Sequence, residues 1–131
     1  MLVLDHISIS VPSIELARPF YDAIMAALGV PKVYDLPEAV GYGTRCSAGD
    51  DAHSYLSVFQ SPGANTDAKR HWCFKAATRA QVEAFYAAGL ANGGKDDGPP
   101  GLRPHYHEAY FAAFLHDPFG NRVEAVCHRV E

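Results

Sequence analysis

The sequence lacks the features that mark several protein classes. In its 131 residues, no apolar run approaches the length of a membrane span. The 11 lysines and arginines form no basic block, and the net charge is −4, so a nucleic-acid partner is not expected. The first residues lack the basic stretch and the long apolar core of a secretory signal. These absences predict a soluble cytoplasmic protein with no membrane or nucleic-acid partner.

Cysteine is scarce and irregularly spaced. The three cysteines, Cys46, Cys73 and Cys127, are odd in number and form no CxxC pair. This pattern argues against a disulfide framework or a zinc knuckle and favours reduced thiols. Apolar residues make up 48% of the chain and charged residues 20%, which is typical of a globular protein. The length predicts one domain, over residues 1–131.

An internal repeat organises the chain. Residues 6–29 can be laid over residues 71–94 without a gap, so that His6 meets His71 and Ser13 meets Thr78. Each copy begins with an alternating strand, continues into a helix and ends in glycine. Ser13 and Thr78 are the expected helix N-caps, and Gln81 completes a capping box with Thr78. The buried helix stripes are predicted to be Ile14, Ala17, Tyr21, Ile24 and Leu28, and Val82, Phe85, Tyr86 and Leu90.

Further strands are predicted after each helix. The clear ones are residues 39–46, 54–60, 109–116 and 121–128, and the weak ones lie near 32–36 and 95–97. Residues 60–68 are expected to link the copies, and the Gly- and Pro-rich residues 98–107 to form a loop. The predicted fold is therefore α+β. It has two βαβββ modules, at about 1–62 and 69–131, related by a pseudo-two-fold axis, with curved mixed sheets enclosing a cleft.

Three residues are candidates for a metal site. His6 and His71 occupy equivalent positions in the two first strands, and both point away from the apolar, helix-facing side. Glu124 lies in the last strand between Val123 and Ala125, so it too is expected on the open face. Two imidazoles and one carboxylate can hold a divalent cation and leave positions open for substrate. A lone strand histidine or terminal glutamate is more often simply solvated, and it is the repeat that favours the metal site.

The chain resembles the vicinal-oxygen-chelate superfamily, which includes glyoxalases, bleomycin-resistance proteins and dioxygenases. The resemblance rests on the repeat, on the FY pair in each helix, and above all on residues 110–125, YFAAFLHDPFGNRVEA. It implies that His6, His71 and Glu124 are ligands of a divalent metal ion: Fe, Zn, Ni or Mn. It also implies a small-molecule substrate and a homodimer, with the site within one chain or across the interface.

The resemblance leaves the reaction open. Glyoxalase I enzymes, which are lyases, use a further glutamate on the last strand of the first module, but residues 54–60 contain no carboxylate. Extradiol dioxygenases carry a tail signature that His107, Asp117, Pro118, Gly120 and Glu124 match. Phe114 replaces its tyrosine, and Tyr110, two pleats away, is a possible substitute. His107 and Tyr110 are thus the candidate catalytic residues.

A metal-free function is the main alternative. Antibiotic-binding proteins of the superfamily use the same fold to bind a ligand with aromatic side chains, and a non-catalytic dimer module is a third possibility. Under the enzyme or the binding hypothesis, Ser8 and Ser10 are expected to line the cleft from the first strand, and Tyr106 from the second loop. Arg103 is the candidate for binding an anionic substrate, although a solvated polar loop is the more common explanation for such a residue.

Overall fold

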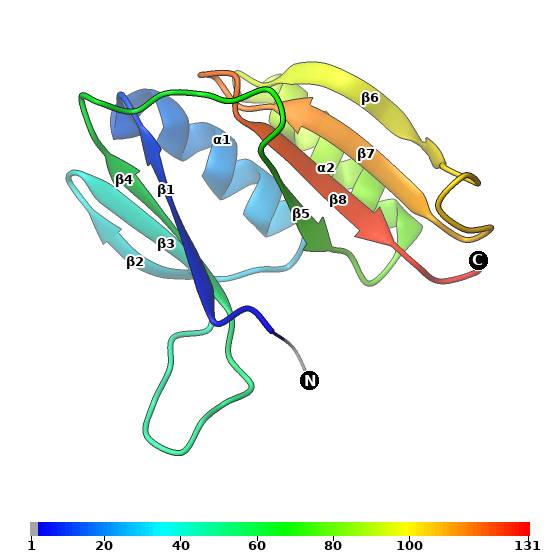
Figure 1. Ribbon diagram of the computed structural model, residues 1–131, viewed down its shortest axis with the longest axis horizontal. Helices are drawn as coiled ribbons and strands as arrows, with labels where there is room; N and C mark the ends of the chain where they lie inside the picture. Colours follow the sequence, from blue (N-terminus) through cyan, green and yellow to red (C-terminus); the bar gives the residue numbers. More distant parts are fainter. Residues whose placement is uncertain (1–2) are drawn as a thin grey trace.

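The computed structural model describes residues 3–131, so the first two residues of the predicted first module lie outside it. Two modules of similar design follow one another along the chain (Figure 1). The first contains β1 (His6–Val11), α1 (Ile14–Ala27), β2 (Lys32–Leu36), β3 (Ala39–Gly43) and β4 (Tyr55–Gln60). The second contains β5 (His71–Lys75), α2 (Arg79–Ala91), β6 (Lys95–Leu102), β7 (Phe111–His116) and β8 (Arg122–Cys127). The repeated order confirms the predicted α+β fold.

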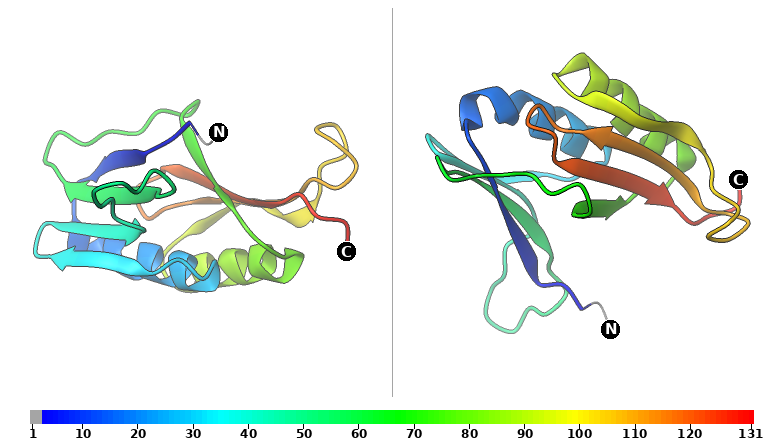
Figure 2. Two further views of the ribbon diagram at one scale, coloured as in Figure 1. Left: turned by 90° about the horizontal axis from the view of Figure 1, so that it is seen from below. Right: turned by 45° about the horizontal axis from the view of Figure 1, so that its top comes forward.

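Each module forms its own four-stranded mixed sheet. The strand orders are β1-β4-β3-β2 and β5-β8-β7-β6, in which β1–β4 and β5–β8 are parallel and the other pairs antiparallel. Both helices lie in one layer, next to each other, on the same side of the two sheets (Figure 2). Each sheet therefore has a helix-covered face and an open face. None of the helices described is long and apolar enough to cross a membrane.

Helix α1 forms as its sequence predicts. The Ser13 side chain accepts a hydrogen bond from the backbone N–H of Leu16 and caps the helix. The helix ends before Gly29, which has a φ of 73° that glycine adopts without strain. All five residues of the predicted stripe are buried, and Phe20 and Met25 join them in the core. The helix runs through Pro19, which is exposed and near its start.

Helix α2 differs from the prediction in the second half of its stripe. Thr78 caps it as expected, but Tyr86 is only partly buried, Leu90 is exposed and Gly89 is buried instead of Leu90. A Cβ on Gly89 would lie 2.3 Å from Leu115 Cδ1 and 3.1 Å from Phe20 Cε2. Glycine at this position therefore lets α1 approach α2 closely, and the inter-helix contact rather than the helical period decides which residue is buried.

The second loop is also shorter than predicted. Residues 98–102 belong to β6, which pairs with β7 through two register shifts, one on each side of Gly98. Gly98 has a φ of 145°, and β6 is the outermost strand of its sheet, where prolines are tolerated because one edge needs no partner. Composition alone therefore marked an irregular edge strand as a loop.

A buried hydrogen-bond network joins the two modules. The Tyr21 hydroxyl of α1 donates to Asp117 Oδ2 at 2.6 Å, in the turn between β7 and β8. Asp117 is 1% exposed and also accepts from the backbone N–H groups of Phe119 and Asn121 and from Asn121 Nδ2. Burial, together with the carboxylate, raises the pKa of Tyr21 well above its usual value. The network satisfies a carboxylate that would be costly to bury alone.

Tyr21→Phe should lower the free energy of unfolding by about 1.5–3 kcal/mol, because it removes a donor from a buried charged acceptor. Denaturant unfolding of the purified variant measures the change. Tyr86→Phe is the matched control, since the Tyr86 hydroxyl donates to Asp96 in an exposed position. That control should change the stability by less than about 0.5 kcal/mol. Equal losses in both variants would show that the inter-module hydrogen bond stabilises the protein no more than an exposed one does.

Candidate functional site

A buried carboxylate lies on the open face of the second sheet. Glu124, in the middle of β8, is 3% exposed and stands in register with Cys73 of β5 and Phe114 of β7. Its Oε1 lies 3.3 Å from His71 Nε2, and its Oε2 accepts a hydrogen bond from the Tyr110 hydroxyl at 2.5 Å. The period-two pattern of each strand brings these side chains to one face, because strand neighbours in register share a side of the sheet. A carboxylate and an imidazole are thus paired on a surface that no helix covers.

Aromatic side chains surround Tyr110. The rings of Tyr106, His107 and His128 lie within 4.7–5.4 Å of the Tyr110 ring, measured between centroids. Burial and the bond to Glu124 raise the pKa of Tyr110, so its hydroxyl keeps its proton at neutral pH. His107 has partners at both ring nitrogens: Ala109 N–H donates to Nδ1, and Nε2 lies 2.9 Å from His128 Nδ1. His107 therefore packs against Tyr110, while Tyr110 itself contacts the carboxylate.

The first sheet carries a second cluster around His6. His6 Nδ1 lies 2.5 Å from Asp5 Oδ1, and the His6 ring stacks on Tyr55 with centroids 4.8 Å apart. The other oxygen of Asp5 lies 2.6 Å from His53 Nε2. The bonds to His6 and then His53 lower the pKa of Asp5, and the bond to Asp5 raises the pKa of His53. Asp5, His53 and Tyr55 were not singled out by sequence reasoning, although the Asp5–His6 dipeptide was visible.

Within one chain, His6 does not join His71 and Glu124. The start of β1, with His6, lines the same groove as Trp72 to Lys75 of β5, whereas His71 stands at the other end of that strand. The two strands run in opposite directions (Figure 1), as a pseudo-two-fold relation requires. Among residues 3–131, no three His, Cys, Asp or Glu side chains are grouped to hold a metal ion. A single chain therefore presents two of the three predicted ligands together.

The position of the first module that is equivalent to Glu124 is occupied by Ser57. Ser57 of β4 stands opposite Ser8 of β1, as Glu124 stands opposite Cys73 of β5. Ser57 is 4% exposed and accepts a hydrogen bond from the Tyr34 hydroxyl at 2.7 Å, much as Glu124 does from Tyr110. A hydroxyl is a weak metal ligand, so the first module lacks a carboxylate ligand at this position.

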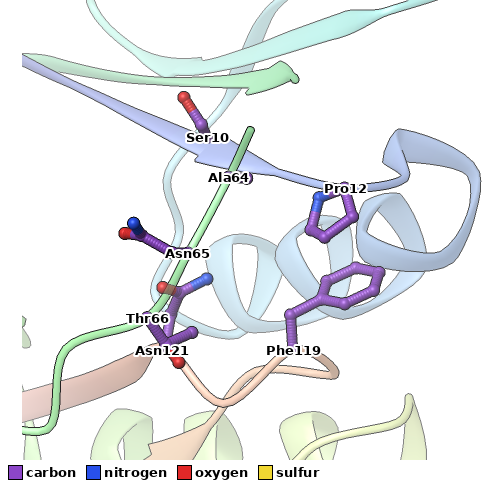
Figure 3. Close-up of a pocket in the computed structure, with 7 residues that line it drawn as sticks. All are labelled: Ser10, Pro12, Ala64, Asn65, Thr66, Phe119 and Asn121. Carbon is purple, nitrogen blue, oxygen red and sulfur yellow. The ribbon is translucent and has the colours of Figure 1, made fainter. Parts of the chain in front are cut away.

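The predicted substrate-binding residues do not gather at Glu124. Ser8 is exposed on the open face of β1, and Ser10 lines a separate small cavity of about 140 Å³ with Asn65, Thr66 and Asn121 (Figure 3). Arg103 donates to the carbonyls of Pro99 and Gly101 of its own segment. Tyr106 is 59% exposed and reaches the site through its contact with Tyr110.

Another arginine has its charged group free. The Arg45 guanidinium lies 5.4 Å from the ring centroids of both Tyr34 and Tyr55 on the open face of the first sheet. Between residues 3 and 131, none of the carboxylates forms a salt bridge with it. Tyr55 also stacks on His6, so Arg45 is the cation next to the His6 cluster. Arg45 lies beside an exposed turn, and no sequence pattern there indicates that it contacts these aromatic rings.

A larger groove separates the start of the first sheet from β5. Its volume is about 560 Å³, which is within the usual range for small-molecule sites. Its lining is mainly apolar and includes Met25, Tyr42, Tyr55, Trp72 and Phe74. Trp72 is partly buried against the core and also lines this groove.

Comparisons with known proteins agree with this architecture. A family model described as "Glyoxalase/Bleomycin resistance protein/Dioxygenase superfamily" matches residues 3–125. A glyoxalase/bleomycin resistance protein from Albidiferax ferrireducens T118 is similar at 27% identity with a TM-score of 0.78, covering 96% of this chain and 98% of that one. No curated protein matches the chain.

Two further solved structures support the fold alone. One is a glyoxalase-related enzyme from Fulvimarina pelagi, at 16% identity and a TM-score of 0.70, covering 97% of this chain and 88% of that one. The other is a lactoylglutathione lyase from Agrobacterium tumefaciens, at 20% identity and a TM-score of 0.61, covering 97% and 94%.

The thiol beside Glu124 offers a test of the site's electrostatics. Partial burial of the thiol and the neighbouring Glu124 charge raise the pKa of Cys73 to about 12, although the residue as a whole is exposed, as Cys46 is. Because the thiolate is the reactive form, alkylation at pH about 8 should be slower at Cys73 than at Cys46. Mass spectrometry of iodoacetamide-treated protein measures both rates, and Glu124→Gln should accelerate the Cys73 reaction. Comparable rates at Cys46 and Cys73 in the unmodified protein would contradict the influence of the Glu124 charge on the thiol.

Proposed function

Because the chain belongs to the glyoxalase/bleomycin resistance protein/dioxygenase superfamily, we propose that it is a metal-dependent enzyme of the glyoxalase/dioxygenase type acting on a small oxygenated substrate. The observation that carries the proposal is the pairing of buried Glu124 with His71 on the open face of the second sheet. A carboxylate and an imidazole are two ligands for Fe, Zn, Ni or Mn. Members of this superfamily often use divalent metals.

The third ligand in this proposal is His6 of the partner subunit in a homodimer. His6 and His71 begin two strands that run in opposite directions, and among residues 3–131 they are not grouped with Glu124 as metal ligands. A two-fold dimer can place the first module of one subunit against the second module of the other. Both β1 and β5 are edge strands of their sheets, and each has a backbone edge available for such a contact.

The residues around Glu124 have distinct proposed roles. A bound divalent cation would supply Lewis-acid stabilisation of charge on neighbouring substrate oxygens. Tyr110 is a proposed catalytic residue: its hydroxyl, 2.5 Å from Glu124, keeps its proton and would donate a hydrogen bond to charge that develops on a substrate oxygen. His107, Tyr106 and His128 pack around the Tyr110 ring and limit its movement. Without a carboxylate at Ser57, the proposed set has three protein ligands, which suits Fe(II) chemistry of the dioxygenase type better than a four-ligand glyoxalase I site.

A metal-free binding protein is the second candidate. The observation that favours it is the apolar groove of about 560 Å³ beside β5, lined by aromatic side chains and by a single lysine, Lys75. Such a groove can hold a small apolar molecule without metal. Metal analysis separates the two candidates before any substrate is known.

Wild-type protein loaded with excess metal and then desalted should retain about one divalent ion per chain, and His71→Ala should retain almost none, since two remaining ligands chelate poorly. Elemental analysis after loading with Fe(II), Zn, Ni or Mn gives the stoichiometry. His116→Ala is the matched control, because His116 lies on the same open face but pairs with Asp97. Equal, sub-stoichiometric metal in wild type and His71→Ala would contradict the metal-dependent enzyme and favour the metal-free binding protein.

A mixing experiment tests the dimeric site. His6→Ala and His71→Ala should each lose metal alone, but co-refolding equal amounts should restore about a quarter of the wild-type metal content. The reason is that half of the dimers are then mixed, and one of their two sites combines an intact His6 with an intact His71. Mixing should restore no metal if all ligands come from one chain.

A further inference from the structure

The Asp5 carboxylate connects His6 to a histidine far away in the sequence. Its Oδ1 lies 2.5 Å from His6 Nδ1 and its Oδ2 lies 2.6 Å from His53 Nε2. His53 belongs to the segment between β3 and β4, and Asp5 immediately precedes β1. Both oxygens of the carboxylate are therefore committed to imidazoles on either side of it.

Polar groups on two sides hold the His53 ring. Its Nε2 faces the carboxylate of Asp5, and its Nδ1 lies 3.1 Å from the carbonyl oxygen of Asp50. Because a carboxylate oxygen accepts, the Nε2–H of His53 can donate to Asp5. The His53 side chain is only 8% exposed, although that of Asp5 is 60% exposed. It fixes Asp5 from the side opposite to His6.

The same reasoning defines the His6 ring. A carboxylate beside Nδ1 accepts the proton of that nitrogen, which leaves the lone pair of a neutral imidazole on Nε2. The Tyr55 ring stacks on His6 with an angle of 8° between the planes and limits rotation of the imidazole. A histidine that binds a metal through one nitrogen typically donates the other N–H to such a carboxylate.

We propose that Asp5 is a positioning residue for His6, holding Nε2 as the free acceptor, and that His53 clamps Asp5 so that the segment between β3 and β4 orients the His6 ligand. The value of this arrangement to a metal site rests on the proposed function. Because the Asp5 side of this contact is 60% exposed, the contact contributes little to stability, which favours orientation rather than folding as its role.

The ring tautomers of the metal-free protein test the proposal directly. Long-range ¹H–¹⁵N correlation spectra at pH about 8, above the ordinary histidine pKa of about 6.5, should show His6 with its proton on Nδ1 and His53 with a proton on Nε2. In Asp5→Asn, whose amide keeps one oxygen acceptor for two imidazoles, the Nδ1–H form of His6 should fall below its wild-type level. His53→Gln should keep the wild-type His6 signals, because its amide can still donate to Asp5, whereas His53→Leu should broaden or shift them. His116→Gln, on the other sheet, should change nothing at His6.

The outcomes separate this proposal from the proposed function. His6 protonated on Nε2 in the wild type, or unchanged spectra in Asp5→Asn, would overturn the positioning role whether or not metal binds. If the wild-type protein binds metal, Asp5→Asn should weaken its affinity by about 10-fold or more, and His53→Gln by less than His53→Leu. The predicted tautomers in a protein that binds no metal would support Asp5 as the positioning residue and refute the metal-dependent enzyme.

Discussion

The bond between the Tyr21 hydroxyl and the buried Asp117 carboxylate fixes how the two modules sit together. It ties α1 to the turn between β7 and β8, while Gly89 allows α1 to pack closely beside α2. A shift of α1 would leave Asp117 short of a donor inside the protein, which is more costly than losing an ordinary hydrogen bond. The helix layer therefore sets the opposite directions of β1 and β5, and with them the separation of His6 from His71.

In the proposed site, the two modules of one chain supply unlike sets of ligands. The second module has Glu124, His71 and Tyr110 on one open face, and the first module has His6 with Asp5 behind it. Because Ser57 occupies the position equivalent to Glu124, the two modules are not interchangeable. In the proposed dimer, unlike modules of two subunits would combine two histidines and one carboxylate and leave open positions for a substrate.

Local patterns were enough to predict most of the fold. The alternation of β1 and β5, the caps Ser13 and Thr78 and the stripe of α1 depend on neighbours in the sequence, and the structure agrees with them. The exposed Leu90 and the strand at residues 98–102 depend on contacts between elements, which periodicity and composition do not record. The same limit applies to the site: the pattern placed Glu124 and Tyr110 on one face, but the engagement of Arg103 and the distance between His6 and His71 follow from tertiary packing.

In the proposed site, one metal ion is bound by unlike modules of two subunits. Anomalous diffraction from crystals grown with a bound divalent metal shows which chains supply its ligands. We expect one anomalous peak per chain at about 2.0–2.2 Å from His71 Nε2 and a Glu124 oxygen, completed by Nε2 of the partner's His6. A peak whose protein ligands all come from one chain, or one that does not involve Glu124, would rule out this site.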